Sequence, residues 1–261
     1  MVKFSIISLF PKTLEAYLES SMLWKAQKDK KISVDLINLR DFADDAKKKE
    51  KSGKRRQIDD RPYGGGPGMV MKAEPLLRAV ESALNSKLKT QSANVGSGRK
   101  DNRVKIVITS PRGKQFDNKL AGRWAKQYEQ IIIIAGHYEG IDARVKKILP
   151  AEEVSIGPYT LTGGEVPSLV IVDAVTRQID GVLGHPESLE EKREAHGEVY
   201  TRPEVIIWPE TKAKSASWRT KLKEKDTKSK SYRVPKVLLS GNPKLIKLWR
   251  AKKSLGDQVT K

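Results

Sequence analysis

The chain has 261 residues and a net charge of +19, from 51 Lys and Arg against 32 Asp and Glu, and it contains no cysteine. The lack of cysteine excludes disulfides and zinc–thiolate sites, and the length allows one large domain or a main domain with a small one. The charge predicts a polyanionic partner, with nucleic acid favoured. An anionic membrane surface is the rival, but neither terminus has a strongly amphipathic basic helix with aromatic anchors, and no apolar run could cross a bilayer.

The N-terminal half predicts two strands and two helices, separated by exposed loops. The first strand is too short for a signal peptide and has no cleavage site, so we expect a cytoplasmic protein. A helix opened by Pro11 carries Leu14, Tyr17 and Leu18 on one face. The other segments are a strand at Lys3–Leu9, a strand at Ile32–Leu39, a Lys-rich loop at 43–58, a Gly/Pro loop at 59–69, a helix at Ala73–Leu88 and a linker at 90–103.

The central part of the chain predicts strands that alternate with helices. The apolar run at 131–136 is typical of a strand that is buried on both faces. The alternation indicates a parallel sheet with helices on both sides. The predicted elements are strands at Val104–Thr109, 131–136 and Val154–Ile156, and helices at Asp117–Gln127, Tyr138–Leu149 and Val166–Ile179.

After Gly184 the sequence becomes polar and basic. Residues 211–233 are Lys-rich, which is typical of a solvated loop that can also touch phosphates. Residues 240–255 predict a basic helix with Asn242 as N-cap, Pro243 in the first helical position, and Leu245, Ile246 and Trp249 facing inward. We expect a first domain at 1–184, a linker at 185–200 and a small basic domain at 201–261 with an insertion at 211–233.

The Gly-rich stretches match no standard nucleotide-binding motif. Gly113-Lys114 precedes Gln115, so it is not a P-loop, and no G-x-G-x-x-G follows a strand. A P-loop NTPase or an NAD enzyme is therefore poorly supported. The three histidines are scattered, and each is interpreted as structural or exposed rather than as a metal ligand; they are His137, His185 and His196.

Three predicted strands end in turns that contain Gly or Pro, at 109–113, 135–140 and 155–164. Ligands of open parallel sheets bind beyond the carboxyl ends of the strands. Three such turns could surround a flat ligand mainly with backbone groups, which suits an adenine ring.

Seven stretches carry a family resemblance: "DDRPYGGGPGMVM", "SPRGK", "GHYEGIDARV", "SIGPYTLTGGEVPSLVIVDAVTR", "GVLG", "YTRPE" and "VLLSGN", in that order. From Lys3 to about Leu255 the chain resembles the bacterial tRNA (guanine-N1)-methyltransferase family, TrmD, of the SPOUT class. The resemblance implies an α/β fold with a deep trefoil knot, a parallel sheet flanked by helices, and a small helical C-terminal domain.

The resemblance also implies that S-adenosylmethionine is the methyl donor and binds in the knot. Some of the glycines in the set could equally serve only to shape the knot. The implied donor-binding residues are Pro111, Gly113, Gly136, Tyr138, Gly140, Ile156, Gly157, Pro158, Tyr159, Thr160, Leu161, Gly163, Gly164 and Pro167.

The resemblance assigns two catalytic residues directly. Arg177 would stabilise the charge that develops on guanine O6, although an arginine after an apolar helix could also simply solvate its end. Glu139 would lie near the donor and the base, and a requirement for Mg²⁺ is linked to it; no residue is assigned as a dedicated metal ligand. The expected substrate-binding residues are Asp60, Arg61, Ser188 and Arg202.

The proton acceptor is where the sequence departs from the family. The family has an Asp in a segment resembling G-N-E-E-S-x-x-x-D-S-F, whereas this chain has Lys192 at the position of that Asp. A lysine would need a strongly lowered pKa to act as a base. Glu190, Glu191 and Glu194 are the neighbouring carboxylates, and we take Glu191 as the base. The alternative is that this run is only a solvated mixed-charge segment.

The resemblance implies methyl transfer to N1 of guanosine 37, 3′ of the tRNA anticodon, by a homodimer that binds neither DNA nor membrane. The C-terminal part departs from the family in its Lys-rich insertion and in ending shortly after "KKSLG". The inserted lysines are expected to compensate through phosphate contacts. One alternative function is a tRNA-binding SPOUT protein that lacks the usual base, and another is a SPOUT enzyme acting on a different RNA.

Overall fold

The structure is a computed structural model that describes residues 1–43, 57–91, 103–183, 198–208 and 230–256. The chain divides into two units, Met1–Leu189 and Glu190–Lys261. Most of the expected linker at 185–200, of the insertion at 211–233 and of the two loops expected at 43–58 and 90–103 lies outside the described residues. The two units are treated separately below.

Five parallel strands form the central sheet of the first unit, in the order β2-β1-β6-β5-β7. The central strand β6 has the sequence QIIII and is buried along its whole length, as its apolar run predicts. The parallel sheet expected from the alternating pattern is therefore confirmed. The strands are β1 Val2–Ser8, β2 Ile32–Asn38, β5 Val104–Gln115, β6 Gln130–Ile134 and β7 Ala151–Ser155.

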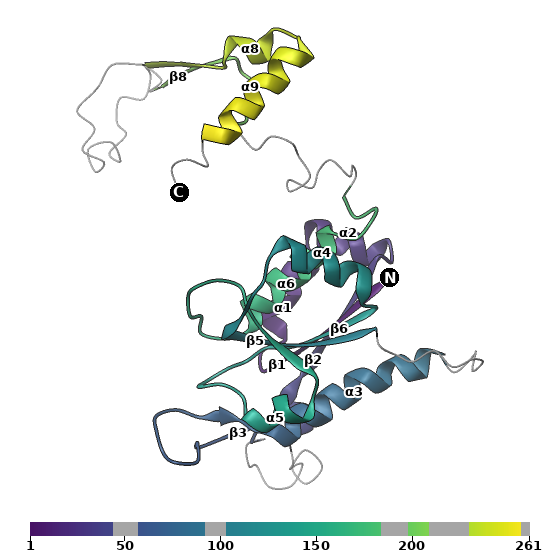
Figure 1. The fold of residues 1–261 in the computed structure, drawn as a ribbon. Coiled ribbons are helices and arrows are strands. Elements are labelled where there is room, and N and C mark those ends of the chain that lie inside the picture. The colour runs from purple at the N-terminus through teal and green to yellow at the C-terminus, as the bar shows by residue number, and fades with distance from the viewer. Residues whose placement is uncertain (44–56, 92–102, 184–197, 209–229, 257–261) are drawn as a thin grey trace. The chain divides into compact units, whose positions relative to one another are not determined.

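Helices cover both faces of this sheet (Figure 1). On one face lie α1 Lys12–Leu18, α2 Ser21–Lys28, α4 Asn118–Gln127 and α6 Glu165–Arg177. On the other face lie α3 Ala73–Gln91, α5 Ala143–Ile148 and the short 3₁₀ helix η1 Leu39–Phe42.

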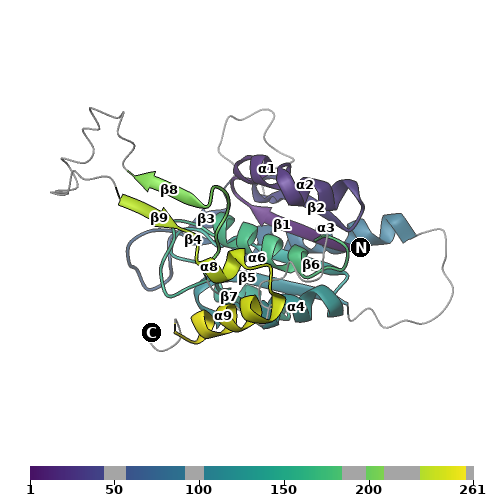
Figure 2. The same ribbon diagram turned by 90° about the horizontal axis from the view of Figure 1, so that it is seen from above.

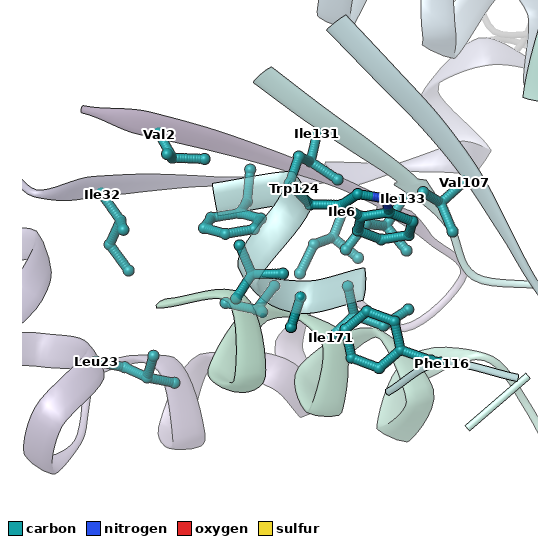
Figure 3. Close-up of a cluster of buried hydrophobic side chains, with 14 of the residues drawn as sticks. Val2, Ile6, Leu23, Ile32, Val107, Phe116, Trp124, Ile131, Ile133 and Ile171 are labelled. Atoms are coloured by element: carbon teal, nitrogen blue, oxygen red, sulfur yellow. The ribbon is translucent and has the colours of Figure 1, made fainter. Parts of the chain in front are cut away.

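Alternate residues of each strand feed two separate hydrophobic cores. In β6, Ile131 and Ile133 point into the α1/α2/α4/α6 side, whereas Ile132 and Ile134 point to the α3/α5 side. Figure 3 shows the first core, in which the rings of Phe116 and Trp124 pack with their centroids 5.4 Å apart. Burial of each large apolar side chain contributes about 1.5–3 kcal/mol, so the two cores hold the strand ends in place.

Three elements differ from expectation in ways that shape the site. The helix expected from Tyr138 begins only at Ala143, because Tyr138 and Gly140 have positive φ angles of 58° and 127°. Strand β5 continues beyond its expected end to Gln115, with a register shift between Thr109 and Lys114 that makes the "SPRG" turn part of the strand. Helix α2 was not expected, because it buries only two side chains.

A short antiparallel pair, β3 Asp59–Asp60 with β4 Val70–Met71, brackets the loop at 61–69. The four glycines of this loop all have positive φ, a backbone conformation that other residues rarely adopt. Met71 also pairs with Ile141 in an isolated parallel bridge. The pair therefore anchors the Gly-rich loop beside the turn that follows β6.

The second unit, expected to be a small helical domain, contains a two-stranded sheet as well as helices. Antiparallel β8 Val205–Trp208 and β9 Lys230–Arg233 are followed by α8 Lys236–Leu239 and α9 Pro243–Gly256 (Figure 2). The last residues of the expected Lys-rich loop thus form β9, because they pair with the β-branched run in β8.

Helix α9 begins as its sequence predicts. Asn242 Oδ1 accepts hydrogen bonds from the backbone N–H groups of Lys244 and Leu245 at 3.1 and 3.3 Å. Ile246 and Trp249 are half-buried, but Leu245 is 49% exposed, so the expectation that it faces inward was wrong. Within the described residues of both units, no helix has the length and apolar character needed to span a bilayer.

Candidate functional site

A cavity of about 750 Å³ lies where β5, β6 and β7 end. Its walls include the irregular part of β5 at 109–112 and the segments that follow β6 and β7, so the three stretches singled out in the sequence do meet in one place. This volume is in the usual range for small-molecule sites. The predicted donor-binding residues on the wall are Pro111, Gly136, Tyr138, Gly140, Ile156, Tyr159, Thr160, Leu161, Gly163, Gly164 and Pro167.

Close backbone approach at Gly136 and Gly164 locks two of the walls together. Gly164 N–H donates to the carbonyl of Gly136 at 2.7 Å, and Gly136 N–H donates to Thr109 Oγ1 at 3.1 Å. A Cβ atom on Gly164 would lie 2.1 Å from Thr109 Oγ1 and 2.5 Å from Gly136 N. Only glycine fits there, which agrees with the alternative that some glycines of the motif shape the fold.

Three predicted donor-binding residues are not among the described residues that line this cavity: Gly113, Gly157 and Pro158. Gly113 instead lets β5 approach β7, because its Cβ would lie 2.3 Å from Val154 N. Gly157 lies under the ring of Tyr159, which a Cβ would meet at 2.3 Å. Gly113 and Gly157 therefore allow close packing next to the wall, whereas Pro158 is exposed.

Charged residues that the sequence analysis missed line another part of the cavity. They include Asp142 and Lys146, which form ion pairs with Arg144 and Glu153, each at 2.6 Å. The side-chain hydrogen bond from Arg144 lowers the pKa of Asp142 below its usual range. Charged residues in a short helix look like a solvated surface in the sequence, which is why they carried no signal. His137, interpreted as structural or exposed, also lines the cavity.

Glu139 lies on the cavity wall, as a residue close to the reacting groups should. Its backbone N–H donates to Met69 O at 3.1 Å, and a Cβ on Gly68 would lie 2.5 Å from Glu139 Oε1. The Gly-rich loop at 61–69 therefore runs directly against this carboxylate. Among the described residues, no group of three or more His, Asp or Glu side chains could hold a metal ion.

Arg177 is the last residue of α6, is half-buried, and is absent from the described residues that line the cavity. Helix α6 starts at the cavity with Glu165, and at 1.5 Å per residue its far end is about 18 Å away. Within one chain, Arg177 and the cavity thus lie at opposite ends of the same helix.

The predicted substrate-binding residues do not gather at the cavity of the first unit. Asp60 and Arg61 are exposed in and after β3; Asp60 Oδ2 lies 3.3 Å from Lys72 Nζ, and the backbone N–H of Arg61 lowers the pKa of Asp60. Arg202 belongs to the second unit, where it is exposed and precedes a cis proline. Outside the described residues lie Ser188, Glu190, Glu191 and Glu194.

Comparison with known proteins identifies the family of the chain. The family model described as "tRNA (Guanine-1)-methyltransferase TrmD" matches residues 2–261. The chain belongs to this family. The TrmD resemblance on seven sequence stretches is therefore confirmed.

Curated proteins with the matching name are similar to this chain over nearly its whole length. A tRNA (guanine-N(1)-)-methyltransferase of Carboxydothermus hydrogenoformans is 40% identical over 258 residues, covering 97% of this chain and 83% of the relative. Proteins with the same name from Moorella thermoacetica and Caldanaerobacter subterraneus are 37% and 40% identical, each covering 97% of this chain and 86% of the relative. The cavity with Gly-rich walls is thus the candidate donor site of a TrmD-family chain.

Proposed function

We propose that this TrmD-family protein transfers the methyl group of S-adenosylmethionine to N1 of guanosine 37 in tRNA. The observation that carries the proposal is the Gly-lined cavity at the ends of β5, β6 and β7. The net charge of +19 fits a tRNA substrate. The proposal places the enzyme in the cytoplasm, where its tRNA substrates are.

The cavity residues fit the methyl donor. The Gly136–Gly164 contact brings two backbone segments of the wall close together, and apolar side chains such as Ile156 and Leu161 line the same cavity. Backbone groups satisfy the uncharged edge of an adenine ring without fixed charge. The bound donor supplies an electrophilic methyl group, and the protein must align it with N1, accept the N1 proton and stabilise charge on O6.

We assign the last two of these tasks to Glu191 and Arg177, and the binding of any Mg²⁺ to Glu139. Glu191 accepts the N1 proton, and Arg177 donates hydrogen bonds to guanine O6 as negative charge develops there. If Mg²⁺ takes part, Glu139 would be the carboxylate that holds it, because Mg²⁺ commonly uses one or two protein carboxylates. Glu139 supports its assignment by its place on the cavity wall.

We further propose that the enzyme is a homodimer in which Arg177 serves the cavity of the partner. Two observations support this arrangement. Arg177 lies at the end of α6 away from its own cavity, and Val166 and Val170 on the same helix are 57% and 40% exposed. Valines exposed one helical turn apart form an apolar stripe that a second copy could cover.

A trefoil knot is also part of the proposal, and the path of the chain supports it. After β7, on one side of β5, the chain returns to the end of β6 on the other side, where Gly163 pairs with His137. It then enters α6. We assign tRNA binding to the basic residues of the second unit, including those of the insertion, with the domain limits given by the sequence.

The test is transfer of a labelled methyl group from the donor to a tRNA transcript with G37, with nuclease digestion to identify the product nucleoside. We expect 1-methylguanosine with the G37 transcript and no product with an A37 transcript. Glu191→Ala should lower kcat by about 10²–10⁴-fold, while Glu190→Ala and Glu194→Ala serve as matched controls. Donor and tRNA binding without methyl transfer would instead favour the impaired tRNA-binding protein.

A further inference from the structure

A cluster of three polar side chains lies at the cavity wall, and none of them was predicted to belong to the site. Ser8 ends β1, His137 follows β6, and Glu165 opens α6. Ser8 is fully buried, and the side chains of His137 and Glu165 are 21% and 12% exposed. Of the three, His137 is on the cavity wall.

The hydrogen bonds of Ser8 determine what Glu165 can do. Ser8 Oγ accepts a hydrogen bond from the backbone N–H of Phe10 at 2.8 Å, so its single proton is directed to Glu165 Oε1, also at 2.8 Å. That carboxylate oxygen is therefore an acceptor.

The second oxygen of Glu165 faces His137. Oε2 lies 3.7 Å from His137 Nδ1, just beyond hydrogen-bond range, and Nδ1 is a buried nitrogen without a hydrogen-bond partner among the described residues. A buried polar atom without a partner is destabilising. A small movement of His137 would satisfy it, and hydrogen bonds at binding sites often shorten when the ligand binds.

His137 is tied to the cavity wall on its other sides. Its backbone pairs with Gly163 in an isolated bridge, and its N–H donates to Met71 Sδ at 3.2 Å. A Cβ on Gly163 would lie 2.4 Å from Glu165 Oε2 and 2.5 Å from His137 Nδ1. A shift of the Glu165 carboxylate is therefore transmitted to two segments of the wall at once.

We propose that Glu165 is a positioning residue for methyl-donor binding, which acts by accepting a hydrogen bond from His137 Nδ1. This bond sets the wall formed by His137 and Gly163, while Glu165 itself lies behind the wall. The inference deepens the proposed function and rests on it, because the wall is that of the proposed donor site.

A double-mutant cycle on the full-length protein tests this coupling. Glu165→Ala, His137→Ala and the double variant are compared by calorimetry with S-adenosylhomocysteine, the demethylated donor, and by kinetics. Each single variant should weaken binding about tenfold, and the double variant no further, since both changes remove one interaction. The donor KM should rise with the binding loss while kcat changes less than about threefold.

Conservative variants and a remote control complete the design. Glu165→Gln keeps an oxygen that can accept the hydrogen bond from Ser8, and it should lose less affinity than Glu165→Ala. If the alanine variants do not fold, the same double-mutant cycle is measured with Glu165→Gln and His137→Asn. Glu129→Gln removes a carboxylate that pairs with Arg103 at the opposite end of β6, and should leave donor affinity unchanged.

Several results would overturn the inference. One is an unchanged affinity for S-adenosylhomocysteine in Glu165→Ala, and another is a loss in the double variant equal to the product of the two single losses. The others are a fall in kcat at constant affinity, and a loss of affinity in Glu129→Gln as large as that in Glu165→Ala. If the wild-type protein bound no S-adenosylhomocysteine, the proposed function itself would fail, so the two failures can be told apart.

Discussion

At the scale of single residues, missing Cβ atoms allow the ends of β5 and β6 and the start of α6 to converge. Gly164 is the clearest case, since its surroundings come from Thr109, Ala135 and Gly136. These three neighbours are backbone atoms or a short buried side chain, which cannot move aside cheaply. The close approach of these segments at the cavity therefore requires glycine at this position.

Gly164→Ala should lower the free energy of unfolding by about 1–3 kcal/mol, as overpacked sites do. It should also abolish tight binding of S-adenosylhomocysteine, because the wall must shift to accept the methyl group. Urea unfolding and calorimetry would measure the two effects. Gly122→Ala is the matched control: in α4 its Cβ would meet nothing closer than 3.5 Å, so we expect unchanged or slightly increased stability. Equal behaviour of the two variants would contradict the argument.

At the scale of elements, the late start of α5 places its first turn at the cavity. Asp142 caps the helix by accepting from the backbone N–H of Arg144 at 2.9 Å, and its carboxylate also pairs with the Arg144 side chain. This double use of one carboxylate fixes where the helix begins. It also makes the N-terminus of α5 sensitive to acid.

Asp142→Ala should lower the free energy of unfolding by about 1 kcal/mol at neutral pH, the usual effect of losing an N-cap. The hydrogen bond from Arg144 lowers the pKa of Asp142 in the folded state below 3.8, the ordinary value for an aspartate. The stabilisation is therefore complete above this value and is lost as pH falls through the lower folded-state pKa.

Urea midpoints of wild type and Asp142→Ala, measured from neutral pH down to about pH 2, should differ at neutral pH and converge as the pH falls. Arg144→Ala is the control, since it keeps the cap but removes the side-chain partner and should move the convergence to higher pH. A difference that stayed constant down to the lowest pH would rule out the assignment.

At the scale of the whole molecule, the two ends of α6 have separate tasks in the proposed dimer. Its first turn belongs to the cavity, and its last residue, Arg177, is the proposed O6 ligand. Since about 18 Å of helix separates them, each active site would need residues from both copies. This arrangement predicts complementation between two inactive variants.

Arg177→Ala and Gly164→Ala should each be inactive alone, and a mixture refolded together should regain about a quarter of wild-type methyl transfer. Random association makes half of the dimers mixed, and each mixed dimer has one intact site out of two. The measurement is transfer to the G37 transcript, with separately refolded and then combined proteins as control. No recovery would mean that Arg177 acts on its own chain's cavity.

Local patterns in the sequence determined the central sheet, most of its helices and the three turns at the strand ends. The apolar run of β6 and the helical spacing of α3 were sufficient, because periodicity and turn residues act over a few positions. The seven ordered stretches also determined the TrmD family, which the family model confirmed.

The tertiary structure alone decided which residues share the site. Ser8 and Glu165 form their hydrogen bond across 157 positions of sequence, and Gly157 is not among the described residues that line the cavity, although it stands in the same motif as Gly163. The prediction that a helix begins at Tyr138 was wrong for a similar reason, since contacts with the Gly-rich loop hold Tyr138 in a left-handed conformation. Side-chain partners depend on how the chain path brings distant segments together, and no local pattern records that path.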